Sequence, residues 1–500
     1  MIGHPSDRYW TTEESVRADL RREPGLLLRL AENALAVSET LRDGYVGNTA
    51  AFVADLKRAM AAAEEGRRAH SVLPLRWVKD TSWSRVRGEV TTFIDGGVGR
   101  ARAANHAPIL LRVGSYTVRA GERDLAKREE FRYYPVILGD LEGGGKERDD
   151  FADVVRIIAE LCGGLAALER IPDLAVLMFH GPLVYHVIDK YVGHTPFTER
   201  DIDLFLSYYA PDHALGDKLK EDFLREARRD IYPRLTPRAA EWATRRLFEP
   251  LAFMAFLQRR LIATARARPD RPVIAGVVER GGRGRDFVER ILLPRVFQGL
   301  RARGNADYFN KLYGRTGFSS PKRLLDSTGY TDALLLALLL DPGQATESWV
   351  GVKHNGLRVA PVVLPGETEP GPVDYTALRG GAIGFPHVRS LYVRVSPESE
   401  PVRVETFKEL GLGQDGQALE AARRAYLYAG LLPGYGFPAG LDTVDKYARV
   451  PGWMSGAYGK LIRYHLGAAL QRGEVDDAAL RRVLVQTIYM NGRDWLLRPQ

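Results

Sequence analysis

Hydrophobic positions along this chain repeat with two different periods, and the first period is helical. Between residues 12 and 70, apolar residues recur every three to four positions, as in LLLRLAENALAVSETL and AAFVADLKRAMAAAEEG. This spacing predicts amphipathic helices, and no residue in them suggests chemistry. We therefore interpret residues 1–84 as a helical N-terminal arm, a candidate for docking or dimerisation.

From Arg85 the pattern becomes that of β-strands. The segment RVRGEVTTFIDGG alternates between apolar and polar positions, is rich in β-branched residues and ends with two glycines. This pattern predicts a strand that runs into a turn. APILLRVGSYTVRAGE and EEFRYYPVIL predict two further strands, and DLEGGGKERDD predicts a polar loop after them. These three strands should form an antiparallel meander.

Helical and strand patterns then alternate. Residues 151–169 predict a helix interrupted at Gly163 and Gly164. DLAVLMFHGPLVYHVI and RPVIAGVVER are almost continuously apolar, which is typical of central strands covered on both faces. Residues 197–270 predict a charged helical insertion over the core. Helices are also expected around 286–302, around 331–340 and from 417 onward, with a strand hairpin over 384–407. The expected fold class is α/β, with a mixed sheet flanked by helices.

Composition adds modest constraints. A net charge of +8 and a pI of about 9.3 are compatible with a polyanionic partner, although an arginine-rich composition also follows from GC-rich coding. The single cysteine, Cys162, excludes an intramolecular disulfide and a cysteine zinc site, and its apolar neighbours predict a buried core residue in a reducing compartment.

The sequence also bears on membranes. The segment MIGHPSDRYW lacks the basic flank and apolar run of a signal peptide. The longest apolar run, Ala333 to Leu340, is far shorter than the roughly 20 residues that a membrane span needs. We expect a cytoplasmic protein with no membrane partner.

Two candidate site residues follow apolar strands. Asp95 is followed by two glycines, which let another chain or a phosphate approach, and a partly buried carboxylate needs a cation or a hydrogen-bond donor. The alternative is an aspartate that caps a turn. His180 repeats the design of apolar strand, polar residue and glycine; a single histidine in such a strand is otherwise a core residue with satisfied hydrogen bonds.

Two more candidates lie in helical segments. Glu160 could face the site or could simply pair with Arg156, four residues earlier. The late segment GYGFPAGLDTVDKY predicts a Gly/Pro turn that leads into a helix. Asp442 suits its first turn, and Asp445 lies three residues further on.

Together these motifs resemble the NurA nuclease family. The DGG strand at 91–97 followed by LLRVGSYTVRAGE resembles the start of a NurA domain. The features that follow also come in the order seen in the family. They are a helical glutamate about 20 residues before a second strand end, a VIAGVV-like strand, an RVE strand at Arg403 to Glu405 and a late turn into a helix. The resemblance spans roughly residues 85–460, which we take as a nuclease domain, with residues 461–500 as C-terminal helices.

The resemblance implies a ribonuclease H-like fold and a DNA nuclease that binds Mn²⁺ or Mg²⁺. It implies 5′ to 3′ exonuclease and single-strand endonuclease activity, and a homodimer that works beside a HerA-type hexameric ATPase in DNA end processing, repair or anti-phage defence. Phosphodiester hydrolysis needs a nucleophilic water and a stabilised leaving oxygen, and two metal ions about 4 Å apart can supply both.

The resemblance carries over directly to Asp95 and Glu160, whereas two positions depart from it. His180 stands where the family has aspartate, and Asp445 stands where the family has histidine. If both side chains meet at one metal, this reciprocal exchange preserves the ligand set. Asp95 would then bridge the metal ions, Glu160 and Asp445 would each hold one, and His180 would complete a shell. Imidazole among carboxylates favours Mn²⁺.

Arginines are the candidate DNA-binding residues. Arg100 and Arg102 follow the glycines of the first strand, and Arg280, Arg283 and Arg285 form the basic segment RGGRGR. Phosphate contacts by these side chains should weaken as salt rises. Arg259, Arg260, Arg266 and Arg268 add charge nearby, and Tyr133 and Tyr134 are candidates for base stacking or for the core.

Two other functions remain open. The chain could be a scaffold with a decayed site that binds DNA or the ATPase, for which His180 is the best argument. It could instead be another enzyme, but no G-x-S-x-G, Walker A or H-E-x-x-H motif occurs, and no G-x-G-x-x-G lies between a strand and a helix. Any ATP-driven step would therefore belong to a partner.

Overall fold

The structure is a computed structural model of the 500-residue chain. It describes residues 17–18, 21–65, 71–100, 109–124, 127, 129–138, 145–184, 199–209, 213–226, 250–279, 284–305, 320–350, 385–411, 416–475 and 477–489. In these ranges no helix is both long enough and apolar enough to cross a lipid bilayer.

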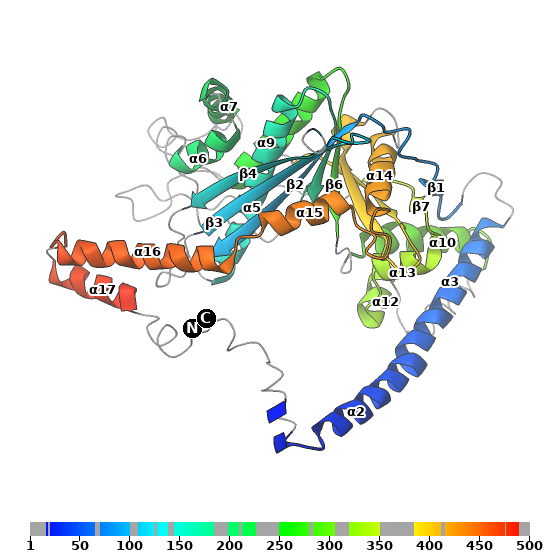
Figure 1. Cartoon of the computed structure of the whole chain (residues 1–500). Coiled ribbons are helices and arrows are strands. Elements are labelled where there is room, and N and C mark those ends of the chain that lie inside the picture. The colour runs from blue at the N-terminus through cyan, green and yellow to red at the C-terminus, as the bar shows by residue number, and fades with distance from the viewer. Residues whose placement is uncertain are drawn as a thin grey trace, which may run out of the picture.

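Within the described ranges, ten strands form one mixed sheet (Figure 1). The strands are β1 (Leu75–Trp77), β2 (Val90–Arg100), β3 (Ile109–Arg119), β4 (Glu129–Leu138), β5 (Leu174–His180), β6 (Val273–Val278), β7 (Gln344–Thr346), β8 (Trp349–Val350), β9 (Val388–Val393) and β10 (Val402–Phe407). Their order is β1-β7-β9-β10-β6-β5-β2-β3-β4, and β8 pairs with β9.

The half of the sheet from β4 to β6 has the ribonuclease H-like arrangement. β2, β3 and β4 form the expected antiparallel meander, and β2, β5 and β6 run parallel to one another. The predicted hairpin of β9 and β10 joins this half through antiparallel pairing of β10 with β6. The predicted mixed α/β fold is therefore confirmed.

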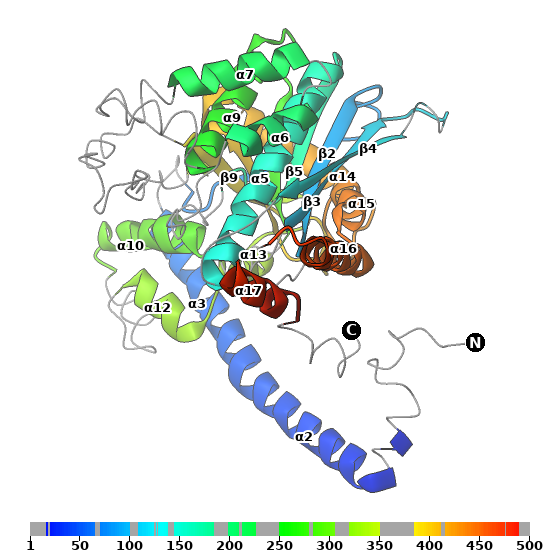
Figure 2. The ribbon, with the colours of Figure 1, turned by 90° about the vertical axis from the view of Figure 1, so that its left-hand side faces the viewer.

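Helices on one face of the sheet bury its alternate residues (Figure 2). They are α5 (Gly145–Arg170), α6 (Glu199–Tyr209), α7 (His213–Glu226) and α9 (Pro250–Ala267). Ile94, Leu177 and Phe179 point into this layer. Cys162 of α5 is buried here as expected, and burial raises the pKa of its thiol to about 12.

The opposite face carries α14 (Gly416–Ala429) and α15 (Ala439–Ala448). Phe93, Val176 and Met178 point into this second layer, because adjacent residues of a strand face opposite sides. A separate apolar cluster lies at the far end of the sheet. It contains α3 (Gly47–Glu64), η5 (Val288–Leu292), α10 (Leu293–Arg301), α12 (Pro321–Thr328) and α13 (Asp332–Leu339).

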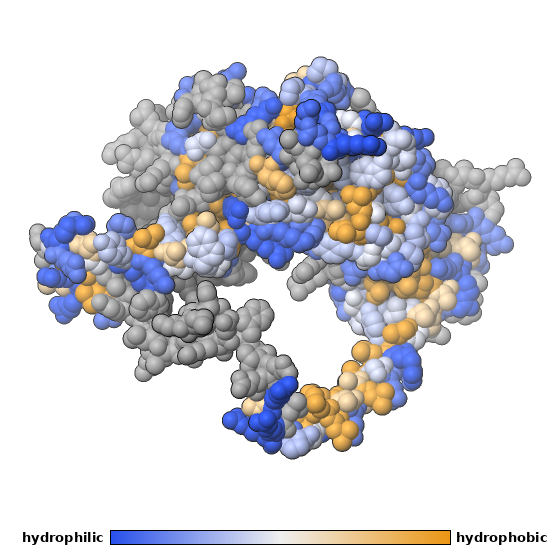
Figure 3. Space-filling view, in the orientation of Figure 1, coloured by the Kyte–Doolittle hydropathy of each residue, from blue (hydrophilic) through white to orange (hydrophobic). Residues whose placement is uncertain are grey.

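Two helical extensions leave the body of the molecule. α2 (Leu26–Thr40) continues through η2 (Leu41–Val46) into α3, and α2 has no buried residue. α16 (Gly452–Gln471) and α17 (Ala478–Tyr489) project from the other side (Figure 1). Leucines along α2 are exposed and form apolar patches on its surface (Figure 3).

Four local predictions need correction. β2 continues through Gly96 and Gly97 to Arg100 instead of turning there. α5 begins at Gly145, within the predicted polar loop, and runs through Gly163 and Gly164 without interruption. The strand predicted from residue 173 onward ends at His180.

Close packing explains these glycines. A Cβ at Gly164 would lie 2.4 Å from the ring of Phe179, and one at Gly163 would lie 3.1 Å from Val113, so both let α5 approach the sheet. Packing rather than local conformational freedom therefore accounts for glycine in this helix.

Candidate metal centre

Strand register brings Asp95 and His180 together. The parallel pairing of β2 with β5 runs to Ile94 opposite Phe179, so Asp95 and His180 are the next residues on the two strands. Both face the layer of α15, and His180 Nδ1 lies 3.1 Å from Asp95 Oδ2. The other carboxylate oxygen of Asp95 accepts the backbone N–H of Gly96 at 2.8 Å.

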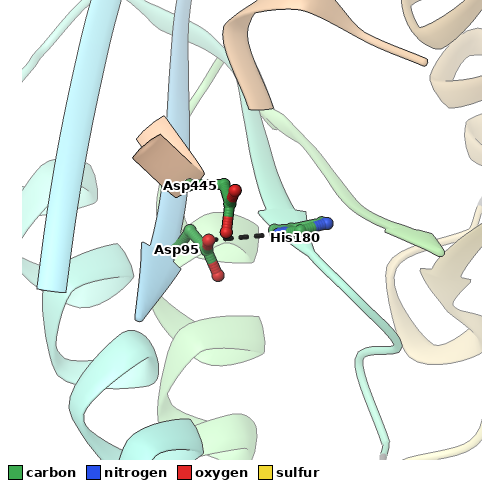
Figure 4. A group of neighbouring side chains, drawn as sticks. All are labelled: Asp95, His180 and Asp445. Atoms are coloured by element: carbon green, nitrogen blue, oxygen red, sulfur yellow. Dashed lines mark ion pairs between the residues drawn. The ribbon is translucent and has the colours of Figure 1, made fainter. Parts of the chain in front are cut away.

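Asp445 reaches the same place from α15, which crosses over β2 and β3. A Cβ at Gly97 would lie 2.1 Å from the carbonyl oxygen of Ala448, and one at Gly114 would lie 2.7 Å from Val444. Glycine at these positions therefore allows the helix to lie directly on the strands. Ligand atoms of Asp95, His180 and Asp445 all lie within 4.8 Å of one another (Figure 4).

Glu160 approaches from the opposite layer, through a gap left by Gly96. A Cβ at Gly96 would lie 2.7 Å from Glu160 Oε1. Glu160 is 2% exposed and forms an ion pair with Arg156, as the helical spacing predicted. The charge of Asp95 nevertheless raises the pKa of the Glu160 carboxylate, and the charge of His180 lowers it. Glu160 therefore lies beside the cluster rather than among its three closest members.

Burial and neighbouring charges shift the protonation of this group. Burial, reinforced by the charge of Asp95, raises the pKa of Glu160 to about 7, although Arg156 opposes the shift. Burial disfavours the charged form of His180, but the hydrogen bond and charge of Asp95 outweigh it and raise the pKa of the imidazole. The cluster thus concentrates negative charge that a cation can compensate.

Each aspartate of α15 pairs with a basic residue one helical turn later. Asp445 Oδ2 lies 2.5 Å from Arg449 Nη2, and Asp442 Oδ2 lies 2.6 Å from Lys446 Nζ. Asp442 occupies the first turn of α15, as predicted. Only Asp445 of the two belongs to the cluster of candidate ligands.

Sequence reasoning missed Glu279, the residue directly after β6. Its carboxylate oxygen Oε2 lies 3.6 Å from His180 Nε2, and its Oε1 accepts the hydroxyl of Tyr435. His180 therefore lies between the carboxylates of Asp95 and Glu279. An acid that ends the apolar run VIAGVV was the available signal, because it repeats the design seen at Asp95 and His180.

This donor set fits a divalent cation. Carboxylate oxygens are the ligands that Mg²⁺ and Mn²⁺ prefer, and Mn²⁺ also accepts imidazole. Asp95 is 4% exposed, and an ionised carboxylate at such depth needs a compensating partner. Asp95, His180 and Asp445 could hold such an ion, with Glu160 close by.

The candidate DNA-binding arginines are only partly described. Arg100 is exposed at the end of β2. Arg285 forms an ion pair with Asp326 at 2.6 Å, so its guanidinium has an intramolecular partner. Arg102, Arg280 and Arg283 lie outside the described residues, as do the side chains of Tyr133 and Tyr134.

The second group of arginines has mainly intramolecular contacts. Arg259 and Arg260 pair with Glu226 and Asp222 of α7. Arg268 donates to the backbone carbonyls of Leu168, Ile171 and Pro172, and Arg266 donates to that of Glu409. These contacts give the group a structural role on the outer side of α9.

Comparison with known proteins agrees with the resemblance seen in the sequence. Residues 304–450 match the family model of the NurA domain. The matched stretch contains Asp445, whereas Asp95, Glu160 and His180 precede it. The predicted resemblance to the NurA family is thus confirmed, and a comparison with curated proteins found no match.

Solved structures of NurA proteins resemble the chain over most of its length. The NurA nuclease from Sulfolobus solfataricus is 13% identical with a TM-score of 0.43, and the similarity covers 87% of this chain and 97% of that one. A crystal structure of NurA bound to dAMP and manganese is 10% identical with a TM-score of 0.32, and the similarity covers 87% of this chain and 94% of that one.

Proposed function

We propose that this protein is a deoxyribonuclease of the NurA type that hydrolyses phosphodiester bonds with Mn²⁺ or Mg²⁺ at Asp95, Glu160, His180 and Asp445. The observation that carries the proposal is the meeting of Asp95, His180 and Asp445 within 4.8 Å, although they come from distant parts of the chain. The match of residues 304–450 to the NurA domain supports a nuclease function for this cluster.

The side chains have distinct roles in the proposal. Asp95 is the central ligand, because it is held by the backbone of β2 and faces both other members of the cluster. Divalent ions held there would supply an activated water and charge stabilisation for the leaving oxygen. Asp445 closes the cluster from above, and Glu160 adds a carboxylate from the other side of the sheet.

The position of His180 and Asp445 supports the reciprocal exchange. Their side chains share one cluster, so exchanging an aspartate and a histidine between β5 and α15 leaves one imidazole and one carboxylate there. The same types of ligand that the family uses are therefore present, but the aspartate and the histidine occupy each other's positions. Imidazole among the ligands favours Mn²⁺ over Mg²⁺.

The wider assignments also belong to the proposal. The enzyme acts on DNA as a 5′ to 3′ exonuclease and single-strand endonuclease, beside a HerA-type hexameric ATPase, in DNA repair or anti-phage defence in the cytoplasm. Arg100 at the end of β2, with Arg102, Arg280, Arg283 and Arg285, contributes phosphate contacts. The protein works as a homodimer, which the exposed apolar side chains of α2 and α16 support.

A cleavage assay with Asp95→Asn tests the proposal. The wild-type protein should degrade single-stranded DNA when Mn²⁺ is present and lose this activity in EDTA. Asp95→Asn should retain less than about a hundredth of the activity, because an amide neutralises the central ligand while leaving its shape. Circular dichroism should show the variant folded. Activity above a tenth of wild type would contradict the assignment.

One observation favours the alternative of a scaffold with a decayed site. Arg449 pairs with Asp445 and Arg156 pairs with Glu160. Two of the four proposed metal-binding residues therefore already have an arginine as a partner. A scaffold would bind DNA but would cleave neither single-stranded DNA nor plasmid with any concentration of Mn²⁺. The same assay on the wild-type protein therefore separates the two functions.

A further inference from the structure

The glutamate of the RVE motif does not belong to the cluster of candidate ligands. Glu405 lies in the middle of β10 and is buried, opposite Gly276 of β6. Its Oε2 accepts the backbone N–H of Leu183 at 2.9 Å, and its Oε1 forms an ion pair with Arg403 Nε at 3.1 Å. The motif thus directs a buried carboxylate at the turn that follows His180.

A second buried side chain holds the other side of the same residue. Gln258 of α9 is 0% exposed, and its Nε2 donates to the carbonyl oxygen of Leu183 at 2.8 Å. Both backbone groups of Leu183 are therefore bound by side chains, one from β10 and one from α9. Irregular backbone can be buried in this way because both of its polar groups have partners.

The turn also lies tightly against β6. Gly181 has a φ of 109° and donates its N–H to the carbonyl oxygen of Val277 at 2.8 Å. A Cβ at Gly276 would lie 2.7 Å from the carbonyl oxygen of Gly181 and 3.0 Å from the nitrogen of Leu183. The chain after His180 is therefore fixed at three places within four residues.

We propose that Glu405 and Gln258 are positioning residues that hold the turn at residues 181–184 and thereby keep the His180 imidazole against Asp95. The role as a support for metal binding rests on the proposed function. Side chains that orient a metal ligand are typically required for tight binding, although they do not touch the metal. Neither Glu405 nor Gln258 lies in the cluster of candidate ligands itself.

The first measurement needs no metal. The full chain, labelled with ¹³C in its histidine rings, is studied by NMR, and the His180 signal is assigned by its loss in His180→Asn. Glu405→Ala removes the acceptor of the Leu183 N–H, and Gln258→Leu removes the donor to its carbonyl, so both should shift the His180 signal. Glu405→Gln keeps an oxygen that can accept the N–H and should leave the signal close to its wild-type position.

Thr406→Val is the matched control. Thr406 is also buried in β10, but as the next residue it faces the opposite side of the strand. This variant should leave the His180 signal unchanged. Calorimetric titration with Mn²⁺ gives the second readout: Glu405→Ala and Gln258→Leu should weaken binding roughly 10- to 100-fold, whereas Glu405→Gln and Thr406→Val should change it less than about threefold.

The outcomes separate the two proposals. An unchanged His180 signal in folded Glu405→Ala or folded Gln258→Leu overturns the positioning role. If Glu405→Ala does not fold, Gln258→Leu decides alone. If the signal moves as expected but the wild-type protein cleaves no DNA with Mn²⁺, the positioning role stands and the proposed nuclease function fails.

Discussion

Asp442 and Asp445 lie three residues apart on α15 and differ in what surrounds them. Each pairs with a basic residue four positions later, but only Asp445 points at Asp95 and His180. The two residues therefore share a helix, a side-chain type and an ion pair. They form a natural comparison of a candidate ligand with an ordinary surface carboxylate.

This comparison gives a prediction for Mn²⁺ affinity. Asp445→Ala should weaken Mn²⁺ binding at least about tenfold, because a carboxylate ligand is lost. Asp442→Ala should leave the affinity within about twofold of wild type, since it removes only the pair with Lys446. Isothermal titration calorimetry measures both. Equal affinities for the two variants would place Asp445 outside the metal centre and end the reciprocal-exchange hypothesis.

At the residue scale, the informative signal in the sequence was a polar residue directly after an apolar run. Asp95 and His180 were recognisable because a polar residue that directly follows an apolar run needs a partner. Glu279 shows the same signal and was overlooked. The contacts of Glu405 and Gln258 with Leu183 could not be foreseen, because they join three segments whose proximity depends on the completed sheet.

At the element scale, glycines determine how closely α15 lies on the sheet. The helix crosses β2 and β3 where Gly97 and Gly114 present no side chain, and its own Gly440 lies against the ring of Phe93. This close approach places Asp445 within reach of Asp95. Glycine in a strand usually weakens it, so the packing of α15 must offset that cost.

Gly97→Ala should therefore damage the proposed metal centre through helix packing. The new methyl group would lie 2.1 Å from the Ala448 carbonyl, a backbone atom that can move only with the helix. We expect a loss of about 1–3 kcal/mol in the free energy of unfolding, typical of an overpacked core. Mn²⁺ affinity should fall together with it. Urea unfolding and calorimetry provide the measurements.

Gly456→Ala supplies the control for this prediction. Gly456 lies within α16, and nothing lies within 4 Å of the position of its missing Cβ. Alanine there should stabilise the protein by roughly 0.5–1 kcal/mol, because glycine is the poorer helix former. Mn²⁺ affinity should not change. A Gly97→Ala protein as stable and as metal-bound as wild type would show that α15 is not held by this contact.

Two of the element predictions failed for a common physical reason. The sequence predicted a turn at Gly96 and Gly97 and an interruption of the helix at Gly163 and Gly164, because glycine ordinarily marks flexible backbone. Here each makes room for a neighbouring element, a role set by tertiary packing that no local pattern contains. Elements with strong periodicity, such as the β2–β4 meander and α5, were predicted correctly in type.

At the scale of the whole molecule, the two helical extensions expose unusual amounts of apolar surface. Leu27, Leu30 and Leu35 of α2 are exposed, and Trp453 near the start of α16 is 72% exposed. Apolar patches of this kind on an extension mark contact surfaces. The proposed homodimer would cover them.

The dimer prediction is tested by polar substitution on α2. The wild-type chain should have twice the mass of one chain in multi-angle light scattering. Leu27→Gln with Leu30→Gln and Leu35→Gln should shift the mass toward one chain, because the contact loses apolar area. Leu338→Gln, an exposed leucine of the globular body, serves as the control and should leave the dimer intact. A wild-type protein that remains a monomer at micromolar concentration would contradict the prediction.

The late position of Asp445 has a consequence for how the protein is made. Asp95, Glu160 and His180 emerge from the ribosome long before α15 does, since α15 begins only at Ala439. A growing or prematurely terminated chain therefore lacks one corner of the cluster, however well its earlier strands have formed. In the proposed nuclease, synthesis itself would thus delay assembly of the metal centre until α15 has been made.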